Sequence, residues 1–266
     1  MTGSYVTVRG LRTYYEEQGA NGQKEEPGAG GPLLLLHGGG VTVESWSAQL
    51  PALAERYRVL APERRGHGRT QDLDGPMTYP GMADDTAALL DERGTGPVRV
   101  VGWSDGGVVG LHLALRRPDL VSKLVVIGTS TDEGAEDSTL VMSADAEETQ
   151  RLLTSMSYPP YAALSPDGPE HFPVVLEKLT RMWREGPGLV LDDLKRIAVP
   201  VLVMLGDRDE VRVEHGAAMA RALPQAQLAV VPGTSHALPL EKPEVVNRLL
   251  LDFLSDAPDV RLLGQF

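Results

Sequence analysis

The chain has 266 residues, of which 42% are hydrophobic and 23% are charged, and 25 Lys and Arg stand against 37 Asp and Glu for a formal net charge of -12. This excess of acidic residues disfavours a nucleic acid or an anionic membrane as partner, and the absence of cysteine excludes disulfides, thiolate metal sites and a cysteine nucleophile. The opening residues have no apolar signal segment, and no apolar run is long enough to span a bilayer. We expect a cytoplasmic monomer or small homo-oligomer whose nucleophile, if it has one, is an oxygen or an amine.

The predicted elements follow one another as strands and helices over most of the chain. Residues 4–17 alternate between apolar and polar side chains on either side of Gly10, which predicts a hairpin at the edge of a sheet. Six short apolar runs are typical of strands buried on both faces: 32–38, 57–62, 97–103, 123–130, 199–207 and 226–232. Helical patterns occupy 46–55, 80–93, 106–117, 213–222 and 243–255. This alternation predicts an α/β protein with a mostly parallel, doubly wound sheet.

The alternation is interrupted between residues 131 and 198, where helical patterns continue without a convincing strand pattern. We predict that residues 131–198 form a helical cap, inserted over one end of a core that is built from residues 1–130 and 199–266. Four large side chains of this segment either line a substrate pocket or form a small core of the cap itself: Met142, Met156, Met182 and Trp183.

A Gly-x-Ser-x-Gly pattern centred on Ser104 directly follows the strand predicted over 97–103 and precedes a helix. A strand, a sharp turn and a helix in this order form a nucleophile elbow, in which the serine is held at a strained positive φ. Gly102 and Gly106 lack a Cβ and allow the strand and the helix to approach closely. A serine that only caps a helix would also match the pattern, so the position after a buried strand is what favours a nucleophilic Ser104.

A serine hydroxyl needs a base that takes its proton and a carboxylate that orients the base. His236 lies in the loop between the last predicted strand and the last helix, and Asp209 directly follows the strand predicted over 199–207. Ser104, Asp209 and His236 therefore come in the order nucleophile, acid and base, each beyond the carboxyl end of a strand, where open parallel sheets bind ligands. Asp207 and Asp132 remain alternatives for the acid.

The remaining histidines outside the segment HGGG (37–40) are weaker candidates for the base. Their positions favour packing or loop geometry: His67 in the loop RRGHGR, His112 within a helix, His171 in the predicted cap and His215 at a helix start. We therefore expect His236 to be the base.

Acyl transfer also needs hydrogen-bond donors that are aimed at the developing oxyanion. The glycines of HGGG follow a predicted strand, and residues without side chains present their backbone N–H groups to a ligand. We expect the N–H groups of Gly39 and Asp105 to form the oxyanion hole, the second at the start of a helix whose dipole favours negative charge. A flexible turn is the alternative for the glycines.

Six segments together resemble the α/β-hydrolase superfamily of serine esterases: HGGG (37–40), RRGHGRT (64–70), GWSDGG (102–107), RRPDLVSKLVVIG (116–128), GDRDE (206–210) and GTSH (233–236). The resemblance covers essentially the whole chain except 131–198 and implies the α/β-hydrolase fold with an inserted cap. The elbow GWSDGG is similar to that of the valacyclovir hydrolase (biphenyl hydrolase-like) subgroup. In that subgroup the Asp after the nucleophile holds the α-amino group of the substrate, and Asp105 stands at the matching position.

These observations lead to the hypothesis of a serine hydrolase that cleaves a small-molecule carboxylic ester through an acyl-enzyme on Ser104, with no cofactor and no metal. Asp105 and Trp103 are candidates for substrate contacts, and a buried Asp105 would favour α-amino-acid esters because an unpaired buried charge is costly. Asp105 is alternatively only a favourable first-turn acid. The same triad could cleave a lactone, thioester, amide or carbon–carbon bond, or carry out acyl transfer or perhydrolysis. A non-catalytic ligand receptor on this scaffold is the alternative from a different class.

Overall fold

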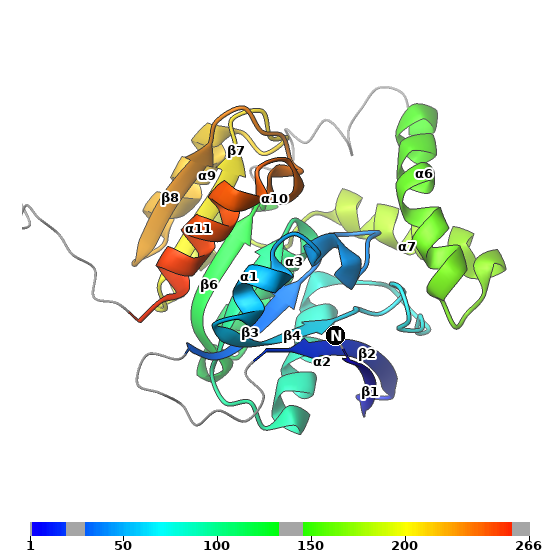
Figure 1. The fold of residues 1–266 in the computed structure, drawn as a ribbon. Helices are drawn as coiled ribbons and strands as arrows, with labels where there is room; N and C mark the ends of the chain where they lie inside the picture. Colours follow the sequence, from blue (N-terminus) through cyan, green and yellow to red (C-terminus); the bar gives the residue numbers. More distant parts are fainter. Residues whose placement is uncertain (1, 20–29, 133–145, 257–266) are drawn as a thin grey trace, which may run out of the picture.

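The computed structural model describes residues 2–19, 30–132 and 146–256, and within them eight strands form one sheet in the order β1-β2-β4-β3-β5-β6-β7-β8 (Figure 1). The strands have these bounds: β1 Thr2–Val8, β2 Leu11–Gln18, β3 Gly30–Leu36, β4 Tyr57–Pro62, β5 Val98–Trp103, β6 Val121–Ile127, β7 Val201–Gly206 and β8 Ala226–Val231. The predicted edge hairpin is β1 and β2, and each of the six predicted apolar runs overlaps a strand. These predictions are confirmed.

The strand directions bring the carboxyl ends of the parallel strands, β3 to β8, to one edge of the sheet. β1 pairs with β2 and β2 pairs with β4 in antiparallel fashion, and every other pair is parallel. The register sets Trp103 opposite Ile127 and Ile127 opposite Met204, so that β5, β6 and β7 end at the same level. Residues that follow these strands are therefore gathered at a single edge, although they are far apart in the sequence.

The strand β3 shows why the central runs are wholly apolar. Leu34 and Leu36 pack into the core on one face of the sheet, Leu33 and Leu35 pack into the core on the other, and all four are fully buried. Burying a leucine stabilises a fold by about 2 kcal/mol. Because both faces are covered, the strand has no polar side to alternate with its apolar side.

Helices cover both faces of the sheet, as a doubly wound fold requires. These are the helical elements outside residues 131–198: η1 Val43–Trp46, α1 Leu50–Ala54, α2 Tyr79–Arg93, α3 Asp105–Arg116, η2 Pro118–Leu120, α9 Val213–Ala222, α10 Leu238–Glu241 and α11 Pro243–Leu254. The buried side chains of α2, α3 and α9 join one core cluster, and those of α1 and α11 join the other, which places the two groups on opposite faces. In the described part of the chain, no helix is long and apolar enough to cross a membrane.

One predicted helix is divided in two. The helix expected over 46–55 is the short 3-10 turn η1, which ends at Trp46, followed after a gap by α1, which begins at Leu50. Pro51 explains the break, because it lacks the N–H that a continuous helix would donate to the carbonyl of Ser47. Its place in the first turn of α1 is tolerated, since a first-turn N–H has no intrahelical partner in any case.

Residues 146–198 contain helices, and no strand occurs in the described residues between 131 and 198. The helices are α6 Ala146–Leu164, η3 Pro169–His171, α7 Phe172–Glu185 and α8 Leu191–Leu194, and Figure 1 shows α6 and α7 together on one side of the molecule. Buried residues of α7 share a core cluster with Met77 and Tyr79, so this segment belongs to the same hydrophobic core as α2. Its role as a separate cap domain stays a prediction.

The cap side chains that the sequence singles out have different environments. Met182 is buried in that shared cluster, whereas Met156 is 58% exposed, and Met142 lies outside the described residues. Trp183 is half-buried and contacts the edge of the sheet that carries Ser104. Of these side chains, Trp183 is the one that the structure brings to the predicted site.

Candidate active site

The backbone of Ser104 has the strained geometry of a nucleophile elbow. Ser104 has φ 56° and ψ -122°, and it is one of two non-glycine residues at positive φ in the described part of the chain. It lies between β5 and α3, and its backbone N–H donates to Ile127 O over 2.8 Å. Such a conformation costs about 1–3 kcal/mol and persists only where the surroundings hold it in place.

Two glycines make this turn sterically feasible. A Cβ on Gly106 would lie 2.0 Å from Leu36 O, and a Cβ on Gly102 would lie 2.3 Å from Gly106 O. Real Cβ atoms do not approach backbone this closely, so any side chain here would separate the strand from the helix. The close approach that the sequence predicts for Gly102 and Gly106 is present.

His236 and Asp209 meet in a hydrogen bond at the same edge of the sheet. The ring nitrogen His236 Nδ1 lies 2.9 Å from Asp209 Oδ1, and the side chain of Asp209 is fully buried. Backbone N–H groups of Val211 and Gly206 also donate to the Asp209 carboxylate, over 3.2 and 3.5 Å. A carboxylate in this setting can orient the imidazole and leave the opposite ring nitrogen, Nε2, to act as a base.

The alternative acids have structural partners instead. Asp207 Oδ1 accepts hydrogen bonds from Gly233 N and Thr234 N, over 2.6 and 3.2 Å, and so braces the turn that leads to His236. Asp132 Oδ1 accepts from Gly188 N over 2.7 Å at the end of the cap segment. Neither contacts His236 in the structure, whereas Asp209 does.

Asp209 changes the protonation behaviour of His236. Burial lowers the pKa of His236, but the hydrogen bond with Asp209 and the negative charges of Asp209, Glu210 and Asp105 raise it, and the net pKa lies above its ordinary value. These negative charges therefore stabilise the imidazolium that forms when His236 accepts a proton.

Gly128 lies between Ser104 and the His236–Asp209 pair, a position that was not predicted from the sequence. Gly128 follows Ile127, the residue that accepts the Ser104 N–H, and it has φ 55°. A Cβ on Gly128 would lie 2.8 Å from His236 Nδ1 and 3.1 Å from Asp209 Oδ2. Within the described residues, no hydrogen bond joins Ser104 Oγ to His236. A glycine directly after a buried strand was the available sequence signal.

The other histidines take part in structural contacts. His67 Nε2 accepts from Gly40 N, His112 Nε2 contacts Pro187 O, His171 Nε2 contacts Asp72 Oδ2, and His215 Nε2 accepts from Thr131 N, over 2.8 to 3.1 Å. These contacts agree with the packing and loop roles that their positions favour.

Both predicted oxyanion donors are backbone N–H groups for which the described residues offer no hydrogen-bond partner. Gly40 N–H donates to His67 Nε2 over 3.0 Å and is therefore occupied. Among the described residues, neither Gly39 N–H nor Asp105 N–H takes part in a hydrogen bond, and Asp105 is the first residue of α3. First-turn N–H groups of a helix have no intrahelical partner, so Asp105 N–H can be given to a ligand.

The side chain of Asp105 already has two neutral donors. Tyr79 Oη donates to Asp105 Oδ1 over 2.8 Å, and Trp183 Nε1 donates to Oδ2 over 2.9 Å and to Oδ1 over 3.1 Å. Burial, and then the charge of Asp105 and the hydrogen bond with it, raise the pKa of Tyr79 well above its ordinary value, so Tyr79 stays protonated. Neither contact could be predicted from the sequence, because α2 and α7 meet Asp105 only in the folded chain.

The Asp105 carboxylate also lies directly against the loop HGGG (37–40), which carries the predicted donor Gly39 and which we call the oxyanion loop. A Cβ on Gly39 would be 2.3 Å from Asp105 Oδ2 and 2.7 Å from Trp183 Cζ2. A side chain at position 39 would therefore displace both groups. The carboxylate lines the site, and it is only 6% exposed.

Trp103 holds the loop that carries His236. Its Nε1 donates to the backbone carbonyl of His236 over 3.0 Å, and its ring packs edge-on against Trp46. Trp103 is 8% exposed. The structure thus gives Trp103 a role in placing His236, and its contact with substrate stays a prediction.

A strained serine between a parallel strand and a helix, on a doubly wound sheet, with a histidine and an acid after later strands, defines the class of α/β hydrolases. The profile of the alpha/beta hydrolase family matches residues 33–249, and the chain belongs to this family.

Relatives within the family are similar over nearly their whole length. The chain is 30% identical to a "Bifunctional esterase/perhydrolase DCH" of Acinetobacter calcoaceticus, with 94% of this chain and 99% of that protein covered. It is 30% identical to a "Non-heme haloperoxidase" of Rhodococcus erythropolis, with 85% and 93% covered. Among solved structures, a thermophilic esterase from Thermogutta terrifontis matches with 27% identity and a TM-score of 0.69, over 96% of this chain and 98% of that chain.

Proposed function

We propose that the protein is a serine hydrolase that cleaves a carboxylic ester of a small molecule through an acyl-enzyme on Ser104. The observation that carries the proposal is the hydrogen bond between His236 and the buried Asp209, which meet at 2.9 Å beside Gly128, the residue after the Ile127 carbonyl that accepts from Ser104 N–H. The ester and perhydrolase names of its relatives agree with this reaction class.

The reaction has two steps. Ser104 Oγ attacks the ester carbonyl and His236 Nε2 takes the hydroxyl proton, while Asp209 holds the ring in the tautomer that leaves Nε2 free. His236 then gives the proton to the departing alcohol, which leaves the acyl group on Ser104. In the second step His236 takes a proton from water and the hydroxide attacks the acyl carbonyl. The bond between that carbon and Ser104 Oγ then breaks, His236 returns the proton to Oγ, and the carboxylic acid is released.

The negative charge of each tetrahedral intermediate would lie between the N–H groups of Gly39 and Asp105. Both groups are open in the structure, and the second is at the start of α3, where the helix dipole favours an anion. One such donor is typically worth about 3–4 kcal/mol of barrier.

The predicted cap would select the substrate. A small cavity of ≈ 10 Å³ lies between the HGGG loop and the predicted cap, and these are six of its lining residues: Gly40, Thr42, His67, Ser157, Tyr161 and Phe172. A cavity this small has room for about one water molecule, which leaves space for at most a short acyl or alkoxy group. We therefore expect small esters to be preferred.

Hydrolysis of p-nitrophenyl esters from acetate to decanoate, with a fluorophosphonate label on the active serine, tests the proposal. We expect turnover that is greatest for the shorter chains, and a label that peptide mass spectrometry places on Ser104. Labelling at another residue would contradict the assignment. Absence of turnover with all esters, thioesters and lactones would instead favour a ligand receptor.

Other reactions could use the same residues. A lactone, thioester, amide or carbon–carbon bond, or peroxide in place of water, would use the same Ser104, His236 and oxyanion donors. Turnover assays with these compounds in place of the esters would rank them by kcat/KM.

We further propose a preference for α-amino-acid esters, since the Asp105 carboxylate lines the site against Gly39. An ammonium group would have to join or replace Trp183 Nε1 as a donor to Asp105 Oδ2. A buried carboxylate attracts a cationic group and does not attract a neutral one. The kcat/KM for valine benzyl ester should therefore exceed that for benzyl 3-methylbutanoate at least about tenfold.

The matched variant Asp105→Asn keeps the backbone donor and removes the side-chain charge. We expect it to abolish the preference for the amino ester while the neutral ester is still cleaved. Equal kcat/KM values for the two esters with the wild-type protein would show that the Asp105 carboxylate only accepts hydrogen bonds from Tyr79 and Trp183 and does not bind an ammonium group.

A further inference from the structure

Arg64 is a buried cation that the proposed mechanism does not use. It follows β4 in the loop RRGHGR and is only 4% exposed. A buried charge is costly unless it is paired or hydrogen-bonded, yet none of the ion pairs among the described residues includes Arg64. Its guanidinium instead donates from Nη2 to the carbonyl oxygen of Gly38 over 2.8 Å.

The acceptor of this hydrogen bond belongs to the same peptide unit as the predicted oxyanion donor. The carbonyl of Gly38 and the N–H of Gly39 lie in one planar group, and in a trans peptide they point in opposite directions. Fixing Gly38 O on the side of Arg64 therefore turns Gly39 N–H away from Arg64.

A second donor holds the same carbonyl. His37 Nδ1 lies 2.7 Å from Gly38 O, and His37 Nε2 lies 3.3 Å from the backbone N–H of Arg64. Burial, and then the charge of Arg64, lower the pKa of His37 well below its ordinary value, so the ring is neutral with one donor and one acceptor. These two contacts fit the tautomer in which Nδ1–H donates to Gly38 O and Nε2 accepts from Arg64 N–H. In that tautomer the 3.3 Å approach of Arg64 Nη2 to Nδ1 is not a hydrogen bond.

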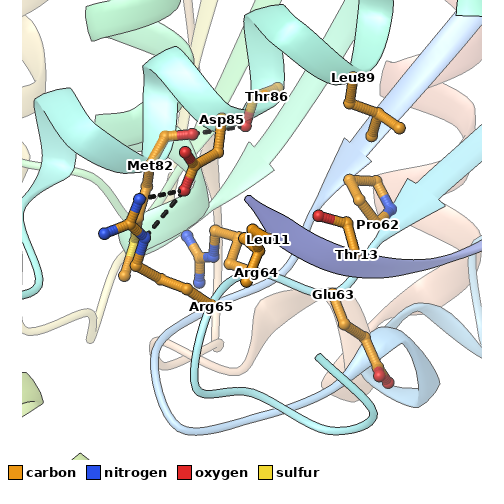
Figure 2. Close-up of a pocket in the computed structure, with 10 residues that line it drawn as sticks. All are labelled: Leu11, Thr13, Pro62, Glu63, Arg64, Arg65, Met82, Asp85, Thr86 and Leu89. Atoms are coloured by element: carbon orange, nitrogen blue, oxygen red, sulfur yellow. Dashed lines mark hydrogen bonds and ion pairs between the residues drawn. The ribbon is translucent and has the colours of Figure 1, made fainter. Parts of the chain in front are cut away.

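The neighbouring arginine has a different arrangement. Figure 2 shows Arg65 joined to Asp85, whereas no dashed line joins Arg64 to the other residues drawn. Arg64 Nε and Nη1 are buried and have no hydrogen-bond partner in the described part of the chain. The charge of Arg64 is thus not neutralised by direct contact with a carboxylate, and its one strong hydrogen bond goes to the oxyanion loop.

A positive charge at this place offsets a feature that would otherwise oppose catalysis. The Asp105 carboxylate lies against Gly39, and its negative charge disfavours an oxyanion there. Burial lowers the pKa of Arg64, and the negative charge of Asp105 offsets part of that decrease. A cation behind the Gly38–Gly39 peptide also polarises it and makes Gly39 N–H a stronger donor.

We propose that Arg64 is a positioning residue of the oxyanion hole: it fixes and polarises the Gly38–Gly39 peptide so that Gly39 N–H binds the charge of the tetrahedral intermediate. This inference rests on the proposed serine hydrolase function. Arg64 would stabilise the tetrahedral intermediate and would not contribute to binding of the neutral ester.

The variants Arg64→Gln and Arg64→Lys test the inference, with kcat/KM expressed per fluorophosphonate-labelled serine so that misfolded protein does not count. We expect Arg64→Gln to lose about 10- to 100-fold in kcat with KM within about threefold, since a misdirected donor costs less than a deleted one. Arg64→Lys keeps the charge and should recover part of the loss. Binding of a trifluoromethyl ketone, which forms an oxyanion on the serine, should weaken by the same factor as kcat/KM.

Arg65→Gln is the matched control, because Arg65 is a half-buried arginine of the same loop whose guanidinium pairs with Asp85 and, within the described residues, makes no hydrogen bond with residues 37–40. We expect it to lower Tm without changing kcat/KM per labelled serine. Arg64→Gln and Arg64→Lys with wild-type kcat/KM per labelled serine would overturn the inference, as would an unchanged affinity for the ketone. Loss of labelling at Ser104 in the wild-type protein would instead refute the proposed function itself.

Discussion

Replacing Ser104 by alanine should lower kcat for p-nitrophenyl esters by about 10⁶-fold, the scale on which removal of a serine nucleophile acts. Without Oγ no acyl-enzyme forms, and His236 and Asp209 have no hydroxyl to activate. A residual rate of about 10³- to 10⁴-fold over the uncatalysed reaction should remain from the oxyanion donors. Stopped-flow assays should lose the initial burst, and undiminished turnover would refute the assignment.

The same position allows strain and chemistry to be separated. Within the described residues Ser104 Oγ makes no hydrogen bond, so Ser104→Ala should leave Tm almost unchanged. Ser104→Gly relieves the positive φ of 56° and should raise the free energy of unfolding by about 1 kcal/mol relative to Ser104→Ala, with equally little activity. Equal stability of the two inactive variants would show that the elbow stores no strain.

The features that the sequence predicts correctly are those that are local or repeated along the chain. Apolar runs such as Leu33 to Leu36 identify strands because both faces of the sheet are covered. Parallel strands then place the residues that follow them at one edge, which is why the meeting of Asp209 and His236 could be expected before any contact was known.

The features that escape prediction depend on contacts between distant segments. Trp183 and Tyr79 donate to Asp105 from α7 and α2, and no spacing rule connects positions so far apart. Arg64 lies in a loop motif that the sequence marks only as geometrically constrained, and its hydrogen bond with Gly38 O depends on how β3 and β4 lie side by side. By contrast, Pro51 was a local signal for the divided helix, and it outweighs the helical pattern over 46–55.

Asp209→Asn should lower kcat by about 10⁴-fold, because an asparagine amide stabilises the wrong tautomer of His236 and cannot stabilise the imidazolium. The pH dependence should change as well. In the wild-type protein the net pKa of His236 is raised, so kcat/KM should rise with a midpoint above pH 6.5, the ordinary value for histidine. In Asp209→Asn the largest raising contributions are lost and burial still lowers the pKa, so the midpoint should move to lower pH.

Asp207→Asn decides between the two neighbouring carboxylates. The amide side chain of this variant keeps an acceptor oxygen for Gly233 N and Thr234 N, so the turn should persist, and kcat should stay within a few fold of wild type. Its midpoint should not move, because the Asp209–His236 hydrogen bond is intact. Both pH profiles would be measured as kcat/KM from pH 5 to 9. If Asp207 were the acid, the midpoint would shift in Asp207→Asn and stay unchanged in Asp209→Asn. An unshifted midpoint in Asp209→Asn would show that the Asp209 carboxylate does not set the pKa of His236.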